Sequence, residues 1–207
     1  MTCNPRNIVR PASGKIIDHY QNGGTSDIIE VIMKADKQSD RYIDRNQARC
    51  LIGSSKYETA RNIWRFVKSN IKYRPDRPGH EVIKTPGALF DQGSGDCKSF
   101  SVAEVALLRA LGFKNIRYRF AAYAPGDYTH VYVVCTINGQ DVILDAVYSR
   151  FDAEARYAHK KDIPAALPKA INGLETLRPA GVRGDLRNVG IGAILLAILG
   201  IYLTSQK

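Results

Sequence analysis

The chain has 207 residues, enough for one globular domain with a core plus an appendage and too few for two large domains. Its formal net charge is +10, but the Lys and Arg residues are spread along the chain and form no basic run or nucleic-acid-binding module. The composition therefore argues against a specific nucleic-acid-binding protein. It predicts a basic, solvated surface that associates at most loosely with anionic polymers or lipid.

The cysteines and histidines give no sign of a metal site or a cofactor. The four cysteines are roughly forty residues apart, and neither a C-x-x-C pair nor a Cys/His cluster of zinc spacing occurs: Cys3, Cys50, Cys97 and Cys135. The first residues include no apolar stretch of the kind found in secretory signals. We therefore expect no metal, no cofactor, and reduced thiols on the cytoplasmic side of a membrane.

The first 55 residues form an N-terminal extension to which the sequence assigns no role. Turn residues dominate it, and residues 26–36 are the one stretch that indicates a helix. From Ser55 the pattern sharpens, because Ser55 and Glu58 have capping-box spacing and apolar residues then recur at helical intervals. This predicts an amphipathic helix over 56–70. The Pro- and Gly-rich residues 73–95 predict a long loop with at most one short element.

The next predicted helix runs from about Lys98 to Leu111 and ends at Gly112. Apolar residues cover most of its circumference, so it is expected to be buried. Cys97 stands at its N-terminus, where the helix dipole favours a thiolate over a thiol. The backbone N–H of Cys97 and the side chain of Gln92 are candidate donors to an oxyanion.

A β-hairpin is predicted around Asn138-Gly139, which lies between two β-branched runs. With these two residues at the tip, Ile137 pairs with Gln140. His130 and Asp145 then share one face of the hairpin, within reach of each other. A bulge or an odd loop length would instead place Asp145 on the opposite face. The other face is uniformly apolar: Val131, Val133, Cys135, Val142, Leu144 and Ala146.

Cys97, His130 and Asp145 are the residue types that cysteine catalysis requires: a nucleophile, a base and a carboxylate that orients the base. The alternative is that Cys97 is a small packing residue and that His130 and Asp145 form an ordinary surface pair. Cys135 is expected to be an inert core thiol. The other histidines have no partner at a useful spacing and are expected on the surface: His19, His80 and His159.

The order of these motifs resembles the transglutaminase-like superfamily. The resemblance rests on "GDCKSFSVAEVALLRALG", "THVYVV" and "LDAVY", preceded by "ARNIWRFVKSNIKY", and covers about residues 56–148. It implies an α+β, papain-like core, with a buried central helix packed on an antiparallel sheet. It also implies Cys97 as nucleophile, His130 as base and acid, and Asp145 as the orienting carboxylate. Two positions where that family often carries an aromatic residue, commonly Trp, are Tyr132 and Leu144 here. The extra domains and calcium sites of the large cross-linking enzymes are missing from the pattern.

Residues 151–188 read as a connector, with at most a short helix around 151–160. Residues 189–204 read as an apolar, membrane-type helix, since Val189 to Leu203 are uncharged. A stripe of small residues on one side of this helix predicts helix–helix contact: Gly190, Ala193, Ala197 and Gly200. Arginines before the segment favour a cytoplasmic catalytic domain: Arg178, Arg183 and Arg187.

Three hypotheses follow. The first is a membrane-tethered cysteine-dependent amide hydrolase or acyltransferase that acts on a protein or peptide, with hydrolysis favoured over cross-linking. The second is a non-catalytic, membrane-anchored structural or assembly protein, for example of a lipid-containing virus particle, that retains the fold. The third is a basic nucleic-acid or envelope binder, which the even charge distribution disfavours.

Overall fold

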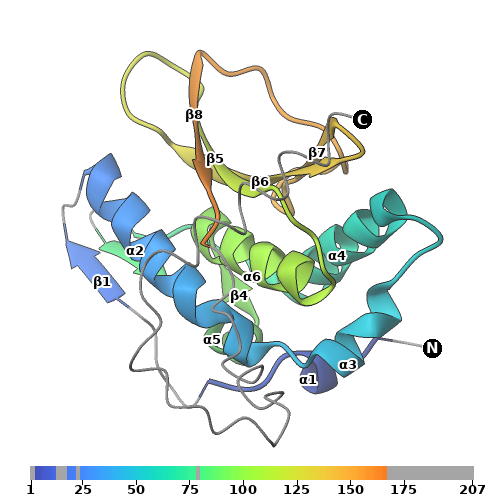
Figure 1. The fold of residues 1–207 in the computed structure, drawn as a ribbon. Coiled ribbons are helices and arrows are strands. Elements are labelled where there is room, and N and C mark those ends of the chain that lie inside the picture. Colours follow the sequence, from blue (N-terminus) through green and yellow to red (C-terminus); the bar gives the residue numbers. More distant parts are fainter. Residues whose placement is uncertain (1–2, 13–17, 22–23, 78–79, 167–207) are drawn as a thin grey trace, which may run out of the picture. The chain divides into compact units, whose positions relative to one another are not determined.

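The structure, a computed structural model, describes residues 3–12, 18–21, 24–77 and 80–166 (Figure 1). The described helices are α1 (Pro5–Ile8), α2 (Thr25–Ser39), α3 (Arg45–Ala48), α4 (Lys56–Asn70), α5 (Pro86–Gln92) and α6 (Cys97–Ala110). The described strands are β1 (Asp18–Gln21), β2 (Lys72–Tyr73), β3 (His80–Ile83), β4 (Ser94–Gly95), β5 (Ile116–Ala122), β6 (His130–Ile137), β7 (Gln140–Leu144) and β8 (His159–Pro164). The predicted α+β class, with a buried central helix on an antiparallel sheet, is confirmed.

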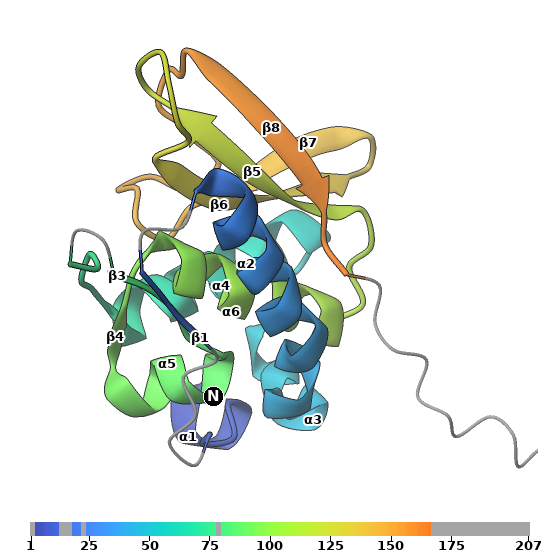
Figure 2. The same cartoon turned by 90° about the vertical axis from the view of Figure 1, so that its left-hand side faces the viewer.

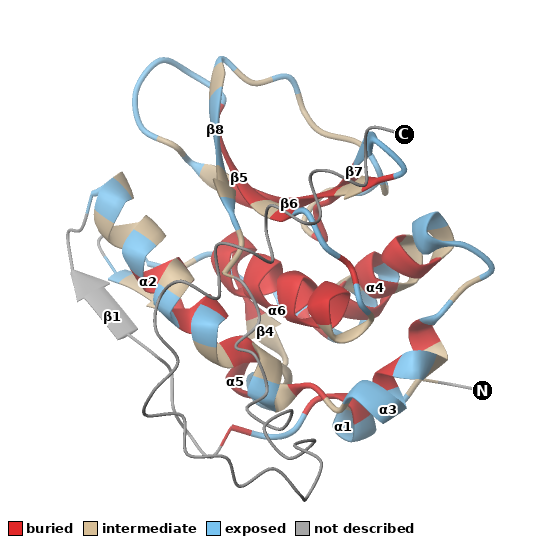
Figure 3. Ribbon diagram, viewed as in Figure 1, coloured by how far each residue is buried: buried red, intermediate tan, exposed pale blue. Residues whose placement is uncertain are grey.

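Helix α6 lies at the centre of the fold, with the sheet on one side and helices α2, α4 and α5 around the rest (Figures 1 and 2). Its residues from Cys97 to Arg109 are all buried (Figure 3). The side chain of Asp96 caps the N-terminus by accepting a hydrogen bond from the Ser99 N–H at 3.2 Å. Gly112 adopts φ +81°, the left-handed conformation that ends a helix. The predicted buried helix is confirmed, with its start one residue earlier, at Cys97.

The main sheet has the strand order β7-β6-β5-β8, and its three pairings are antiparallel. The predicted hairpin register is confirmed, because Ile137 pairs with Gln140 and Val133 pairs with Leu144. Asn138 and Gly139 both have positive φ, 51° and 82°, as a type I′ turn requires. The apolar face of the hairpin joins the same core as α6.

Helix α4 holds the turn that follows β7. Ser55 caps this helix by accepting a hydrogen bond from the Glu58 N–H, as the sequence predicts. Within the helix, the indole N–H of the buried Trp64 donates to the backbone oxygen of Asp145 at 2.7 Å. One turn later, Lys68 donates to the backbone oxygens of Ala146 and Tyr148 at 3.0 and 2.9 Å. Helix α4 therefore fixes the position of a turn about eighty residues away in sequence.

Two regions differ from the sequence prediction. Residues 73–95 contain β3, α5 and β4, where a loop with at most one short element was expected. Strand β3 pairs with β1, and β4 pairs with β2, so these short strands depend on partners distant in sequence. Within 151–160 the structure has the start of strand β8 instead of a short helix. Its "HKKDIP" sequence lacks an apolar pattern because β8 is an edge strand of the sheet.

The expectation of four reduced thiols is wrong, because the structure contains a disulfide bond between Cys3 and Cys50. Their Cα atoms lie 5.7 Å apart, a normal separation for a disulfide, although 47 residues separate them in sequence. Their spacing alone gave no reason to pair them. Disulfides persist in oxidising compartments, so the basis for expecting a reduced chain is removed. Cys97 and Cys135 are free, buried thiols.

The predicted apolar helix over 189–204 and most of the predicted connector lie outside the described residues. Within the part of the chain that the structure describes, none of the helices has the length and apolar character needed to span a membrane.

Candidate active site

Cys97 is the first residue of α6, and only 9% of its surface is exposed. It borders a cavity of about 310 Å³ together with His130, which begins strand β6. The packing of β6 on α6 brings the two residues to the same place. The rest of the cavity wall mixes apolar, aromatic and charged side chains: Ile28, Glu81, Lys98, Phe120, Tyr128, Thr129 and Val131. The free amides of the first turn of a helix also favour negative charge at this end of α6.

His130 and Asp145 are joined by a hydrogen bond of 2.7 Å between Nε2 and Oδ2. Their side chains are only 12% and 7% exposed. The other carboxylate oxygen of Asp145, Oδ1, accepts from the backbone N–H of Val147 at 3.0 Å and of Tyr148 at 3.3 Å. Asp145 is therefore held by its own turn and faces His130 with a fixed oxygen. With Nε2 occupied, Nδ1 is the ring nitrogen available to Cys97.

The surroundings of His130 favour its protonated form. Burial alone would lower the pKa of the imidazole, but hydrogen-bond and charge interactions with Asp145 and Cys97 outweigh it and raise the pKa to about 10. An imidazolium between a carboxylate and a cysteine is the arrangement in which a thiolate is stabilised as an ion pair. His130 therefore holds its proton near neutral pH, bonded to Asp145 and beside Cys97 at the cavity.

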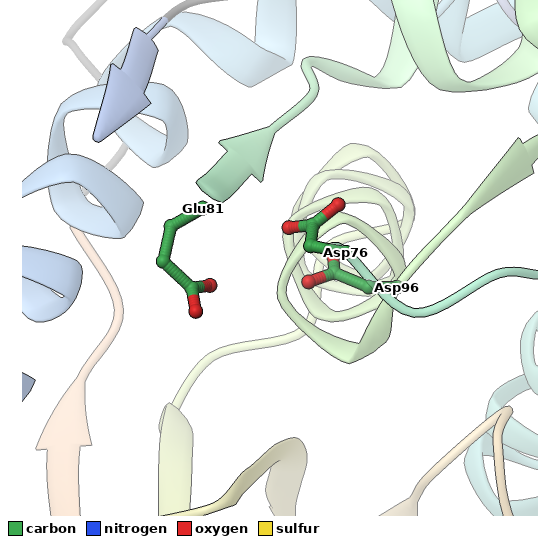
Figure 4. Close-up of side chains that lie close together, drawn as sticks. All are labelled: Asp76, Glu81 and Asp96. Carbon is green, nitrogen blue, oxygen red and sulfur yellow. The ribbon is translucent and has the colours of Figure 1, made fainter. Parts of the chain in front are cut away.

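A group of three carboxylates lies close together near the start of α6: Asp76, Glu81 and Asp96 (Figure 4). Their oxygens are close enough together to bind a metal ion. The ammonium group of Lys98 already lies among them, 3.2 Å from Asp76 and 2.5 Å from Glu81, and it also pairs with Asp96. Burial raises the pKa of Asp96, and the Lys98 charge opposes that shift. The protein's own cation therefore pairs with all three carboxylates of this group.

Two exposed tyrosines lie near the site, Tyr73 after α4 and Tyr123 after β5; they are 43% and 45% exposed. The Tyr73 ring contacts the Phe100 ring edge-on, and the Tyr123 ring lies 6.2 Å from the His130 ring, centroid to centroid. Partial burial and the negative charges of Asp145 and Cys97 raise the pKa of Tyr123 to about 12. Both tyrosines offer aromatic surface near Cys97 and His130.

The residues of this site lie in a part of the chain that matches a known protein family. A family model described as the transglutaminase-like superfamily matches residues 47–153, slightly over half of the chain. The chain belongs to this superfamily. The resemblance inferred from the sequence is confirmed, and the matched range is wider than the 56–148 on which it rested. It includes Cys97, His130 and Asp145.

The relatives are distant. A UPF0252 protein of Pyrococcus furiosus is 23% identical over 100 residues, which are 48% of this chain and 30% of that protein. The chain thus spans less than a third of that curated relative. The EGTA-treated structure of Legionella pneumophila LapG is 18% identical, with a TM-score of 0.47, covering 68% of this chain and 88% of LapG. The calcium-bound LapG structure is 20% identical, with a TM-score of 0.44, covering 58% and 75%.

Within this transglutaminase-like core, the structure brings Cys97, His130 and Asp145 together. Gln92, the candidate oxyanion donor, is exposed at the end of α5 and is not among the residues that line the cavity beside Cys97. Sequence reasoning missed the two tyrosines, because Tyr73 in the two-residue strand β2 and Tyr123 just after β5 carry no local signal. It also missed the role of Lys98, although Lys98 directly follows the nucleophile position in the family motif.

Proposed function

We propose that this transglutaminase-like chain is a cysteine-dependent amide hydrolase that acts on a protein or peptide. The proposal depends on one observation: Cys97 and His130 line the same cavity, and Nε2 of His130 is hydrogen-bonded to Asp145 at 2.7 Å. A buried Cys or His alone would be unremarkable, but this order of contacts is the one nucleophilic catalysis needs.

The proposed reaction begins with attack of the Cys97 thiolate on the carbonyl carbon of a peptide, isopeptide or glutaminyl amide. The carbonyl oxygen becomes an oxyanion near the first turn of α6, where backbone N–H groups can donate to it. His130 then gives its proton to the leaving nitrogen, the C–N bond breaks, and a thioester remains on Cys97. Asp145 keeps the ring oriented throughout, because its carboxylate is fixed by the Val147 and Tyr148 amides.

Water or an amine resolves the thioester. His130, now neutral, accepts a proton from the incoming nucleophile, and the S–C bond breaks to regenerate the thiolate–imidazolium pair. We propose hydrolysis as the main outcome and transfer to an amine as the lesser one. His130 is itself partly exposed at the cavity, which leaves a path for water.

The test is the rate of iodoacetamide alkylation at each free cysteine between pH 5 and 9, read by mass spectrometry. Cys97 is expected to react quickly near pH 6, and His130→Ala is expected to slow it about ten-fold or more at that pH, because the imidazolium that stabilises the thiolate is lost. Cys135 is the internal control, since burial raises the pKa of its thiol to about 11. His80→Ala, which removes an exposed histidine, is the matched control for His130→Ala.

The catalytic proposal would be contradicted if Cys97 reacted no faster than an ordinary thiol in both the wild type and the His130→Ala variant. The membrane-anchored structural or assembly protein would then be the better account of the fold.

We also propose that the core is tethered to a membrane through residues 189–204. The support is compositional: Val189 to Leu203 carry no charged side chain, and the small residues Gly190, Ala193, Ala197 and Gly200 would permit contact between copies. The full chain is expected to float with lipid vesicles in a density gradient, whereas a chain ending at Asn188 should stay at the bottom. Equal flotation of the two chains would contradict the tether and, with it, placement in a virion membrane.

A further inference from the structure

Tyr132 is a buried tyrosine to which the proposed mechanism gives no role. It lies two residues after His130 in β6, so the two side chains share one face of the strand. Only 1% of its surface is exposed. The centroids of the Tyr132 and His130 rings are 5.5 Å apart, and the ring planes are tilted by 34°. This distance lies in the range of direct ring contact, so the imidazole of His130 packs against a buried aromatic ring.

The hydroxyl group of Tyr132 is tied to an ion pair. It donates a hydrogen bond to Oε2 of Glu154, a residue in the segment between β7 and β8. The same oxygen accepts from Nη1 of Arg119 at 3.1 Å. The Nε and Nη2 atoms of Arg119 donate to the two carboxylate oxygens of Asp162, both at 2.8 Å. Tyr132 is therefore held at both ends, by its ring contact with His130 and by its hydroxyl bond to Glu154.

The register of the main sheet brings these groups together. Arg119 of β5 pairs with Tyr132 of β6 and with Asp162 of β8. The three strands are neighbours in the sheet (Figure 1). The side chain of Arg119 is 4% exposed, and its double bond to one carboxylate fixes the plane of the guanidinium group. Three strands thus contribute to the support of the Tyr132 hydroxyl group.

His130 needs more than Asp145 to fix its ring. The hydrogen bond from Asp145 holds one ring atom, Nε2, but the torsion that turns a histidine ring is soft. An aromatic ring packed against the imidazole restricts this rotation. The raised pKa of His130 also means that the imidazole is charged near neutral pH, and a nearby aromatic face favours a cation. Tyr132 is placed to act on both the orientation and the charge of His130.

We propose that Tyr132 is a positioning residue for His130, and that its hydroxyl bond to Glu154, which Arg119 supports, keeps its ring against the imidazole. This inference rests on the proposed function for its catalytic meaning. Its structural content, the link from Arg119 through Glu154 and Tyr132 to His130, stands apart from any reaction. Tyr132 touches no reacting atom in this account and acts through His130 alone.

The experiment compares two variants at position 132 in the full chain. Tyr132→Phe keeps the ring and removes the hydroxyl group, whereas Tyr132→Leu removes the ring as well. Tyr157→Phe is the matched control, because Tyr157 packs against the same small apolar cluster as Tyr132. Three quantities are measured: the iodoacetamide alkylation rate of Cys97 at pH 6, the pKa of His130 by NMR, and the urea midpoint of unfolding.

We expect Tyr132→Phe to slow the alkylation of Cys97 about three- to five-fold, because a ring without its hydroxyl bond holds the imidazole less firmly. Tyr132→Leu should slow it about ten-fold or more, since the contact with the imidazole is lost. The pKa of His130 should fall in the same order, because a freely turning ring bonds less well to Asp145. Tyr157→Phe should stay within about two-fold of the wild-type rate and leave the pKa of His130 unchanged.

A double variant tests the route of this effect. Glu154→Ala should slow the alkylation of Cys97 about as much as Tyr132→Phe does. In the Tyr132→Phe background, Glu154→Ala should change the rate by less than about two-fold, because the hydroxyl bond through which it acts is already absent. Additive losses would mean that Glu154 does not act through Tyr132 and would overturn the proposal.

The urea midpoints separate positioning from general stability. A lower midpoint with a wild-type alkylation rate and a wild-type pKa of His130 would overturn the proposal, since Tyr132 would then support only the fold. Wild-type values in Tyr132→Phe would overturn it as well. If Tyr132→Leu does not fold, Tyr132→Phe and the double variant decide. A wild-type Cys97 without fast alkylation would defeat the proposed function, while the pKa of His130 in the variants would still decide the role of Tyr132.

Discussion

The pair formed by His130 and Asp145 links the stability of the fold to pH. In an unfolded chain a histidine has a pKa of about 6.5, and in the folded protein the pKa of His130 is raised to about 10. A raised pKa means that the folded state binds the proton more tightly. The resulting stabilisation is fully present below about pH 6.5 and is lost as the pH rises through about 10. For so buried a pair it is on the order of a few kcal/mol.

We therefore predict that the free energy of unfolding of the wild type falls between pH 6.5 and 10, and that His130→Ala removes most of this decline. Urea denaturation at pH 6, 8 and 10 measures it. Asp145→Asn should flatten the curve in the same way, since it removes the anion that holds the proton. Parallel curves for wild type and both variants would show that the pair does not control this titration.

At the scale of elements, Lys98 joins three parts of the chain that are separate in sequence. Its ammonium pairs with Asp96 before α6, with Glu81 on β3, and with Asp76 in the loop between β2 and β3. Its side chain is 10% exposed and that of Asp96 only 3%. The group therefore anchors the short β1–β3 ribbon to the start of α6, beside the cavity that Cys97 borders.

Replacing Lys98 by Met should destabilise the fold by about 3–5 kcal/mol at pH 7, because the carboxylates lose their buried counter-ion. The double variant Lys98→Met with Asp76→Asn should recover part of this loss, since one of the repelling anions is removed. Lys114→Met, at an exposed position, is the control and should change stability by less than about 0.5 kcal/mol. Chemical denaturation measures all three; a double variant no more stable than the single one would contradict the repulsion.

The elements that the sequence predicted well are those with local signals. Ser55 and Glu58 mark the start of α4, Gly112 marks the end of α6, and Asn138-Gly139 sets the register of the β6–β7 hairpin. In each case residues a few positions apart determine the geometry. The register in turn places His130 and Asp145 on one face, so this half of the candidate site follows from the sequence.

The elements that escaped prediction depend on partners far along the chain. Strands β3 and β8 gain their hydrogen bonds from β1 and β5, and no local pattern in either strand reveals that pairing. The same reason hid the role of Lys98, which looks like an ordinary polar residue in an apolar helix. Its pairing with Glu81 arises only when distant segments pack on α6.

At the scale of the whole molecule, the segment around Ile8 and Val9 belongs to the core. Ile8 and Val9 are buried with the main hydrophobic cluster, and Val9 forms a β-bridge with Ile43. The disulfide between Cys3 and Cys50 joins this segment to the short 3-10 helix at Arg49–Leu51. The bridge closes a loop with a sequence separation of 47 residues, long enough for its loss to increase the entropy of the unfolded chain substantially.

Removing the bridge with Cys3→Ala and Cys50→Ala together should therefore lower the free energy of unfolding by about 2–4 kcal/mol. A reductant should destabilise the wild type by a similar amount and leave the double variant unaffected, which separates the bridge from general effects of the reagent. Neither cysteine lines the cavity beside Cys97, so the alkylation rate of Cys97 should stay the same in the folded double variant. Equal urea midpoints with and without reductant would mean that the bridge adds nothing to the stability of the fold. A changed Cys97 rate would instead mean that the N-terminal segment influences the site through the core.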